Sequence, residues 1–282
     1  MRLDEIEESS NVEDRRGSRP GGKLAVGGGL GTIVIVILYS LLGGNPNDLK
    51  SVLPSGGGMT TQQGKMSPAD EEGFKFVSKV LKETETVWDK VFPDQLGKSY
   101  VHPKLVVFTE QVQSGCGMAD TGVGPFYCPA DSNVYIDLAF YETMEKQLGA
   151  SGDFAQAYVV AHEVGHHVQN LLGTSNKVNE LRARLNEKDF NKISVKMELQ
   201  ADFLAGVWAH YATELQIDEQ DVREAMNAAQ QIGDDTLQKR SQGYVQPDSF
   251  THGTSAQRVK WFMAGFRSGK ISDGDTFNTR NL

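Results

Sequence analysis

Apolar and polar positions along the chain predict one helix followed by strands in its first half, and helices in its second half. From residue 68 to residue 91, apolar side chains recur every three or four positions, as in a helix that buries one face. Residues 105–108 and 134–140 are short apolar runs rich in β-branched and aromatic side chains, which is typical of strands. Further helices are expected at residues 154–172, 194–215, 218–232 and 254–266.

Capping residues support the helix boundaries. Ser67 precedes the first helix, and Ser151 or Asp153 precedes the next long helix. Thr254 and Gln257 form a capping-box pattern before the last helix. Because strands come first and helices follow, the sequence predicts an α+β domain in which a small sheet packs with several helices.

Residues 24–42 contain no charged side chain. As a helix, this stretch would be about 28 Å long, close to the hydrocarbon thickness of a bilayer. A cleaved signal peptide fits less well, because 23 residues precede the apolar run and no Ala-x-Ala-like site follows it. A buried core helix would be unusual between a polar tail and a Gly-rich linker. We therefore expect a membrane-spanning anchor.

The charges that flank this segment predict its orientation. Only Lys50 follows it closely, whereas four basic side chains precede it: Arg15, Arg16, Arg19 and Lys23. The positive-inside rule then places the N-terminus in the cytoplasm and the rest of the chain outside. The expected organisation is a cytoplasmic tail at 1–23, a single-pass anchor at 24–42, a flexible linker at 43–68 and a folded domain at 69–282.

The two cysteines, Cys116 and Cys128, both follow this segment and lie in a Gly-rich stretch at residues 113–133 that we expect to be a loop. In a compartment outside the cytoplasm, such a pair favours a disulfide, with two free thiols as the alternative. A cysteine-ligated zinc site is disfavoured, because it would need a second pair.

The net charge of the chain argues against one class of function, nucleic-acid binding. The formal net charge is -9, from 37 acidic and 28 basic side chains. Nucleic-acid binding needs clustered Lys and Arg, so this balance argues against nucleic acid as the main partner. A modestly acidic surface is otherwise typical of a soluble domain.

The most informative motif is His-Glu-x-x-His in one of the expected helices. His162 and His166 are four positions apart, so both imidazoles lie on one helix face and can bind one zinc ion. Glu163 can reach a water molecule on the metal, whose pKa zinc lowers, and act as general base. Gly165 leaves room for another backbone to pack closely. His167 faces away from the other two histidines, so we expect it to pack in the core or to support a ligand rather than to bind the metal.

A zinc hydrolase needs a third protein ligand and an open fourth position. Glu198 and Asp202 lie four apart on the next expected helix, so Glu198 can bind the metal while Asp202 accepts a hydrogen bond from His162. His210 and His252 are alternative ligands, but His210 lies over three turns beyond Glu198 and is expected to be structural. A metzincin is excluded, because its Gly and third His are replaced here by Gln and Leu.

Several motifs in register resemble the neutral zinc metallopeptidases, bacterial membrane proteins also called YpfJ-like. The motifs are NVEDRRG at 11–17, GPFYCP at 124–129, YIDL at 135–138, HEVGHHVQN at 162–170 and ELQAD at 198–202. The resemblance implies a zincin-like domain with Zn²⁺ at His162 and His166 and with Glu163 catalytic. It also implies a bacterial membrane protein. Together with the orientation predicted from the charges, the expected location is the bacterial cytoplasmic membrane, with the catalytic domain outside the cytoplasm.

Two elements also resemble the gluzincins. Their Glu-x-x-x-Asp element matches Glu198 and Asp202, which implies Glu198 as third ligand. The stretch THGTSAQR is similar to the Thr-His-Pro…Arg element of membrane-linked gluzincins, with Gly253 in place of Pro. By this similarity, His252 can donate a hydrogen bond to a developing oxyanion and Arg258 can orient nearby carboxylates.

The resulting hypothesis is a membrane-anchored peptidase that hydrolyses peptide bonds through a zinc-bound water. Glu163 takes a proton from that water and returns it to the leaving amine, while zinc and His252 stabilise the oxyanion. The strand at residues 134–140 offers an edge to an extended peptide. The alternatives are a catalytically silent zinc-fold protein with a binding or assembly role in the bacterial envelope, and a zinc hydrolase with a non-peptide substrate. The presence of Glu163 favours an enzyme.

Overall fold

The computed structural model describes residues 1–17, 67–120, 123–279 and 282. The expected membrane anchor at residues 24–42 lies outside the described residues, as does nearly all of the expected linker. Among the residues that are described, we find no helix whose length and apolar character would let it cross a bilayer.

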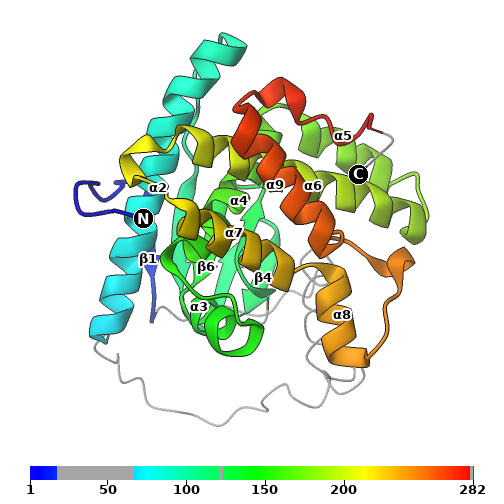
Figure 1. Ribbon diagram of the computed structural model, residues 1–282, viewed down its shortest axis with the longest axis horizontal. Helices are drawn as coiled ribbons and strands as arrows, with labels where there is room; N and C mark the ends of the chain where they lie inside the picture. The colour runs from blue at the N-terminus through cyan, green and yellow to red at the C-terminus, as the bar shows by residue number, and fades with distance from the viewer. Residues whose placement is uncertain (18–66, 121–122, 280–281) are drawn as a thin grey trace.

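A four-stranded sheet in the order β1-β2-β6-β5 forms one layer of the domain (Figure 1). β2 (Lys104–Phe108) is parallel to both of its neighbours, β1 (Val12–Arg15) and β6 (Asn133–Asp137). β5 (Phe126–Cys128) lies at one edge and runs antiparallel to β6. The strand expected at residues 105–108 is confirmed.

The stretch at residues 113–133, expected to be a loop, contains strands instead. β3 (Gln111–Ser114) and β4 (Gly117–Asp120) form an antiparallel hairpin. The predicted disulfide between Cys116 and Cys128 is confirmed and joins this hairpin to β5. The hairpin covers a small core on one face of the sheet, which includes Val106, Phe108, Val112, Ala119 and Tyr135.

β6 ends at Asp137, three residues before the expected end of this strand, because Asp137 accepts a hydrogen bond from the backbone N–H of Ala139 and begins a turn. A short helix α3 (Ala139–Thr143) and one π-helical turn (Met144–Leu148) follow. β6 lies between β2 and β5, so both of its edges are already hydrogen-bonded. The prediction that residues 134–140 offer an open edge is therefore wrong, and the strand at this edge of the sheet is β5.

The helices cover the opposite face of the sheet and bury the main core with it. α2 begins as predicted, since the Ser67 hydroxyl accepts a hydrogen bond from the backbone N–H of Asp70 in a capping box. The Thr254–Gln257 capping box is also confirmed. The helices are α2 (Pro68–Leu96), α4 (Asp153–Leu171), α5 (Thr174–Arg182), α6 (Glu187–Tyr211), α7 (Glu219–Gln231), α8 (Asp234–Gln242) and α9 (Ser255–Ser268), with 3-10 turns at Thr213–Leu215, Pro247–Ser249 and Ile271–Asp273.

Several boundaries differ from those expected. α4 has Gly152 at its N-cap and no side-chain cap, so the expected cap at Ser151 or Asp153 is wrong. α6 begins seven residues before position 194, because the Asn186 side chain caps it through the backbone N–H of Asp189. α5 and α8 were not predicted, since both are polar and bury few side chains.

Close contacts between backbones hold α4, α6 and α9 together. A Cβ atom at Gly165 on α4 would lie 2.9 Å from the carbonyl oxygen of Ala201 on α6, which confirms the close packing expected there. A Cβ atom at Gly265 on α9 would lie 1.9 Å from the carbonyl oxygen of Phe203 on α6. Since only glycine fits at these crossings, the three helices can bring their side chains to one point.

Residues 1–17 belong to the domain, so the expectation of a separate tail at 1–23 is wrong for them. β1 extends the sheet at β2, and the side chain of Ile6 is buried in the main core. The segment is polar, and much of what holds it is backbone pairing and buried hydrogen bonds, which hydrophobic periodicity does not report.

Candidate metal centre

Two turns of α4 and one turn of α6 form the centre of the site. Nε2 of His162 lies 3.1 Å from Oε2 of Glu198, and Nε2 of His166 lies 3.5 Å from the other carboxylate oxygen, Oε1. One ligand atom from each of these three residues lies within 4.8 Å of the others. The structure therefore brings the three predicted ligands together.

The outer nitrogen of each imidazole is held by an oxygen atom. Nδ1 of His162 lies 2.8 Å from Oδ1 of Asp202, and Nδ1 of His166 lies 2.8 Å from Oε1 of Gln169. The Gln169 amide is itself fixed, because its Nε2 donates to the carbonyl oxygen of Met197 at 2.7 Å. With Nδ1 donating in both rings, the lone pair of each Nε2 faces the common centre, which is the donor set that zinc prefers.

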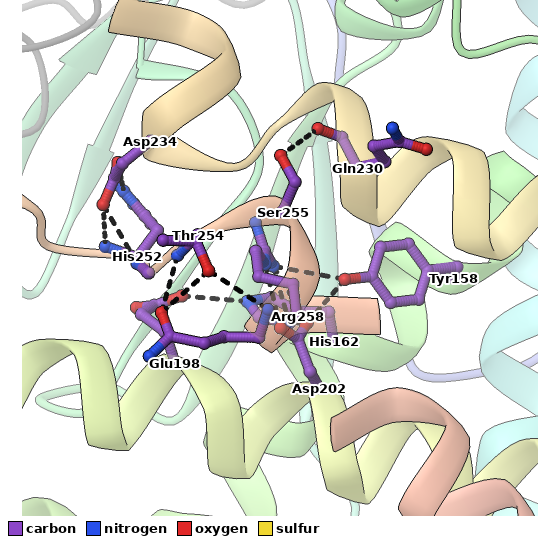
Figure 2. Close-up of polar contacts among 12 residues, drawn as sticks. Tyr158, His162, Glu198, Asp202, Gln230, Asp234, His252, Thr254, Ser255 and Arg258 are labelled. Atoms are coloured by element: carbon purple, nitrogen blue, oxygen red, sulfur yellow. Dashed lines mark hydrogen bonds and ion pairs between the residues drawn. The ribbon is translucent and has the colours of Figure 1, made fainter. Parts of the chain in front are cut away.

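Asp202 is fully buried and is the hub of a hydrogen-bond network (Figure 2). The Arg258 guanidinium donates to both of its oxygens, from Nε at 2.8 Å and from a terminal nitrogen at 2.9 Å. The Tyr158 hydroxyl donates to Oδ1 at 2.5 Å. Burial would raise the pKa of Asp202, but the charges of Arg258 and His162 outweigh it and hold that pKa well below its usual range. Asp202 and Arg258 thus meet as predicted.

The ligand side chains form an environment that favours a cation. Burial alone would lower the pKa of His166, but the charge of Glu198 raises it to about 9. Burial would raise the pKa of Glu198, yet the neighbouring imidazoles bring that pKa well below its usual range. Protons on the rings supply positive charge here, and a divalent metal would replace them as it bound.

The carboxylate of Glu163 lies near His166, whose pKa its charge helps to raise, but takes no part in the hydrogen-bond network. The residue is 8% exposed, and its side chain makes no hydrogen bond or ion pair with any residue that the structure describes. The buried hydroxyl of Tyr141 also has no partner within the described ranges. Burial and the nearby charge of Glu163 raise the pKa of this tyrosine. Glu163 is therefore available to a water molecule at the metal.

His252 reaches the site from the loop before α9 (Figure 2). Its Nδ1 lies 3.1 Å from Oδ1 of the buried Asp234, the first residue of α8. The other oxygen of Asp234 accepts the backbone N–H groups of Thr251, His252 and Gly253 at 2.8, 2.7 and 3.0 Å. Burial would lower the pKa of His252, but the charges of Asp234 and Glu198 raise it. Gly253 has φ +92°, which a proline cannot adopt, so the chain path differs here from a Thr-His-Pro element.

Comparisons with known proteins agree with this geometry. The family model described as "Putative neutral zinc metallopeptidase" matches residues 1–277. This chain belongs to that family. It is 48% identical to "Uncharacterized protein YpfJ" of Escherichia coli over 98% of this chain and 99% of that protein. It is 40% identical to "Uncharacterized protein Rv2575" of Mycobacterium tuberculosis over 70% of this chain and 68% of that protein. No solved structure matches.

Membership of a neutral zinc metallopeptidase family implies Zn²⁺ as the cofactor, and the group His162, His166 and Glu198 is positioned to bind it. His167 and His210 contact other parts of the chain instead. Nε2 of His167 lies 2.6 Å from the carbonyl oxygen of Val101, and Nδ1 of His210 lies 2.8 Å from that of Phe266. Both therefore have the structural roles that the sequence predicts.

Three residues around the candidate metal centre were not predicted from the sequence. Tyr158 lies one turn before His162 and Gln169 lies three residues after His166, so helical spacing could have indicated both. Asp234 had no such signal, because it is separated by 18 residues from the histidine that it contacts.

Proposed function

We propose that this chain is a zinc-dependent peptidase. The proposal rests on one arrangement: two imidazoles and a carboxylate face a common point, and Glu163, whose carboxylate has no partner among the described residues, directly follows the first of these ligands in sequence. The family description supports it, since it names a zinc metallopeptidase.

The roles of the chain's own residues follow from their contacts. Zinc bound here would polarise a substrate carbonyl and lower the pKa of a coordinated water. His162, His166 and Glu198 would hold the ion, and Asp202 orients the first imidazole. Glu163 accepts the proton of the attacking water and delivers it to the leaving amine.

His252 is placed to stabilise negative charge on the substrate. Its Nδ1 is engaged by Asp234, so its Nε2 is the atom left to donate a hydrogen bond. Asp234 also raises the pKa of this imidazole, which favours the protonated, donating form. A donor at this position would act on the carbonyl oxygen as it becomes an oxyanion.

The strand β5 is the proposed docking edge for an extended substrate. It pairs with β6 alone within its sheet, so its other edge has no strand partner among the described residues. Side chains of α4 hold β5 next to the metal helix, because the hydroxyl of Tyr127 accepts a hydrogen bond from Asn170 at 2.9 Å. An added peptide strand would pair its backbone with β5 and pass the metal centre.

The proposed location is the outer face of the bacterial cytoplasmic membrane. Membrane attachment is proposed from the uncharged sequence at residues 24–42. An extracytoplasmic domain is proposed from the disulfide between Cys116 and Cys128, because such bonds persist in oxidising compartments.

The decisive experiment compares Glu163→Gln with the unchanged full-length protein. Casein cleavage should fall by roughly 10²–10⁴-fold, the range for loss of a general acid–base group. Zinc content, measured by elemental analysis, should stay at the level of the unchanged protein. Glu145→Gln is the matched control, since Glu145 is exposed and outside the site, and it should cleave normally. Equal cleavage by the Glu163→Gln protein with its zinc retained would exclude the proposed base.

A further inference from the structure

The surface formed by β2 and α2 is occupied by residues 1–17 of the same chain (Figure 1). β1 pairs in parallel with β2 in a register that matches Val12 with Leu105 and Arg15 with Phe108. The pairing continues before the strand, where the backbone N–H of Leu105 donates to the carbonyl oxygen of Asn11 at 2.9 Å. Two residues before Asn11, the N–H of Ser9 donates to the carbonyl oxygen of Ser78 on α2 at 3.2 Å.

Buried polar groups tie this segment to α2. The side chain of Glu85 on α2 is 3% exposed, so its carboxylate is buried. Its Oε1 accepts hydrogen bonds from the Ser9 hydroxyl and from the Asn11 amide, both at 2.7 Å. Without residues 1–17, this carboxylate would lose both hydrogen-bond donors and keep only the longer contacts to Lys82 at 3.9 Å and His102 at 3.7 Å, and removing the donors of a buried charge is destabilising.

Arg16 makes the corresponding contact from the N-terminal segment. Its side chain is 2% exposed and donates to the carbonyl oxygen of Asp70 at 2.7 Å. It also forms an ion pair with Glu71 at 3.2 Å and lies over the ring of Phe74, 4.5 Å from its centroid. A buried guanidinium with partners on α2 fixes the end of β1 at the start of that helix.

The short distance between paired strands determines on which side of a membrane this segment can lie. Paired strands lie about 4.8 Å apart, whereas the hydrocarbon core of a bilayer is about 30 Å thick. β1 and β2 therefore cannot pair across a membrane. β2 is in turn part of the domain that holds the metal centre.

We infer that residues 1–17 and the metal centre lie on the same side of any membrane that the chain contacts. Gly17 and Ser67, which flank the interval containing the uncharged stretch 24–42, are then both on that side. A single crossing at 24–42, with the N-terminus in the cytoplasm and the domain outside, would separate β1 from β2. This inference does not depend on peptidase activity.

The test uses the full-length chain in spheroplasts of an Escherichia coli host and a membrane-impermeant maleimide. Ser10→Cys and Ser99→Cys each place one thiol at an exposed position, one on each side of the interval. Cys116 and Cys128 stay in their disulfide and do not react. Equal labelling of the two variants is expected, and labelling of one with protection of the other would overturn the inference.

A third variant tests the docking on which the inference rests. Ser9 is 7% exposed, whereas its neighbour Ser10 is exposed, so Ser9→Cys should label at least about tenfold more slowly than Ser10→Cys. Equal rates at the two neighbours would show that the segment is not docked and would remove the argument. Detergent-permeabilised cells serve as the control for thiol reactivity at all three positions.

Discussion

Nδ1 of His162 lies 2.8 Å from Asp202, and Nε2 of the same ring lies 3.1 Å from Glu198. One imidazole therefore connects the carboxylate that orients it with the carboxylate that completes the metal centre. Both acids come from successive turns of α6, which explains why a spacing of four residues is needed between them.

Zinc affinity should depend on Asp202 although it is not a ligand. Asp202→Asn replaces a charged acceptor by a neutral amide, so the His162 ring is held less firmly and becomes less basic. We expect zinc affinity to fall by about 10–100-fold, measured by competition with a chelator. Tyr158→Phe is the matched control, because it removes one donor and keeps the Asp202 charge, and it should have a smaller effect. Unchanged affinity in a folded Asp202→Asn protein would contradict this role.

Catalysis should depend on Asp234 without a change in zinc content. Asp234→Asn keeps the size of the side chain but removes the charge that raises the pKa of His252. We expect kcat for casein peptides to fall by about 10–100-fold, somewhat less than the loss of an entire oxyanion donor. Asp248→Asn, at an exposed position, should leave kcat unchanged. If zinc is lost together with activity, Asp234 supports the metal centre rather than the oxyanion donor.

Glu83 on α2 should make the fold less stable at alkaline pH. Its side chain is 2% exposed, and burial together with the charge of Glu214 raises its pKa from 4.5 to about 7. The folded state therefore holds a proton that the unfolded state releases, so stability declines as pH rises from 4.5 to about 7.

Glu83→Gln should remove this dependence. At pH 8 the variant should exceed the unchanged protein in free energy of unfolding by on the order of 2–3 kcal/mol. Near pH 4.5 the difference should largely vanish, because the folded state then holds the proton and the unfolded state is about half protonated. Urea denaturation at both pH values measures this, and Glu72→Gln, at an exposed position of the same helix, is the control. A difference that does not vary with pH would rule out titration of Glu83 as the cause.

Reduction of the disulfide should destabilise the domain. Cys116 and Cys128 are 12 positions apart, and closing a loop of this length contributes about 3 kcal/mol by restricting the unfolded chain. The free energy of unfolding in urea should fall by this amount when a reductant is added. The Cys116→Ser/Cys128→Ser protein should be equally unstable with and without reductant. If the reductant destabilises that variant too, the effect does not come from this bond.

Features encoded by local sequence were predicted well. The positions of His162 and His166 follow from helical spacing alone, and the capping boxes at Ser67 and Thr254 depend on residues three apart. The pairing of Glu198 with Asp202 was likewise predicted from their spacing of four residues on a single helix. In each case the physical cause lies within one turn of backbone, so the sequence shows it directly.

Features that depend on distant partners were not predicted. β1 has only four residues and gains its stability from β2, about ninety positions later in the chain. α8 has few apolar side chains, and its first residue, Asp234, is held by a loop that follows it. The open edge was assigned to β6 instead of β5 because strand order in a sheet is not a local property.

The close approach of Gly165 to the Ala201 carbonyl has a consequence for how the sequence can vary. At that crossing α4 and α6 are separated by main-chain atoms alone, so no rotamer change can widen or narrow the gap. The two histidines on α4 and the glutamate on α6 project from backbones that are held at this fixed distance. The distance between the two helix backbones that carry the ligands is then a property of the peptide scaffold, and sequence drift among the surrounding core side chains can proceed without altering it.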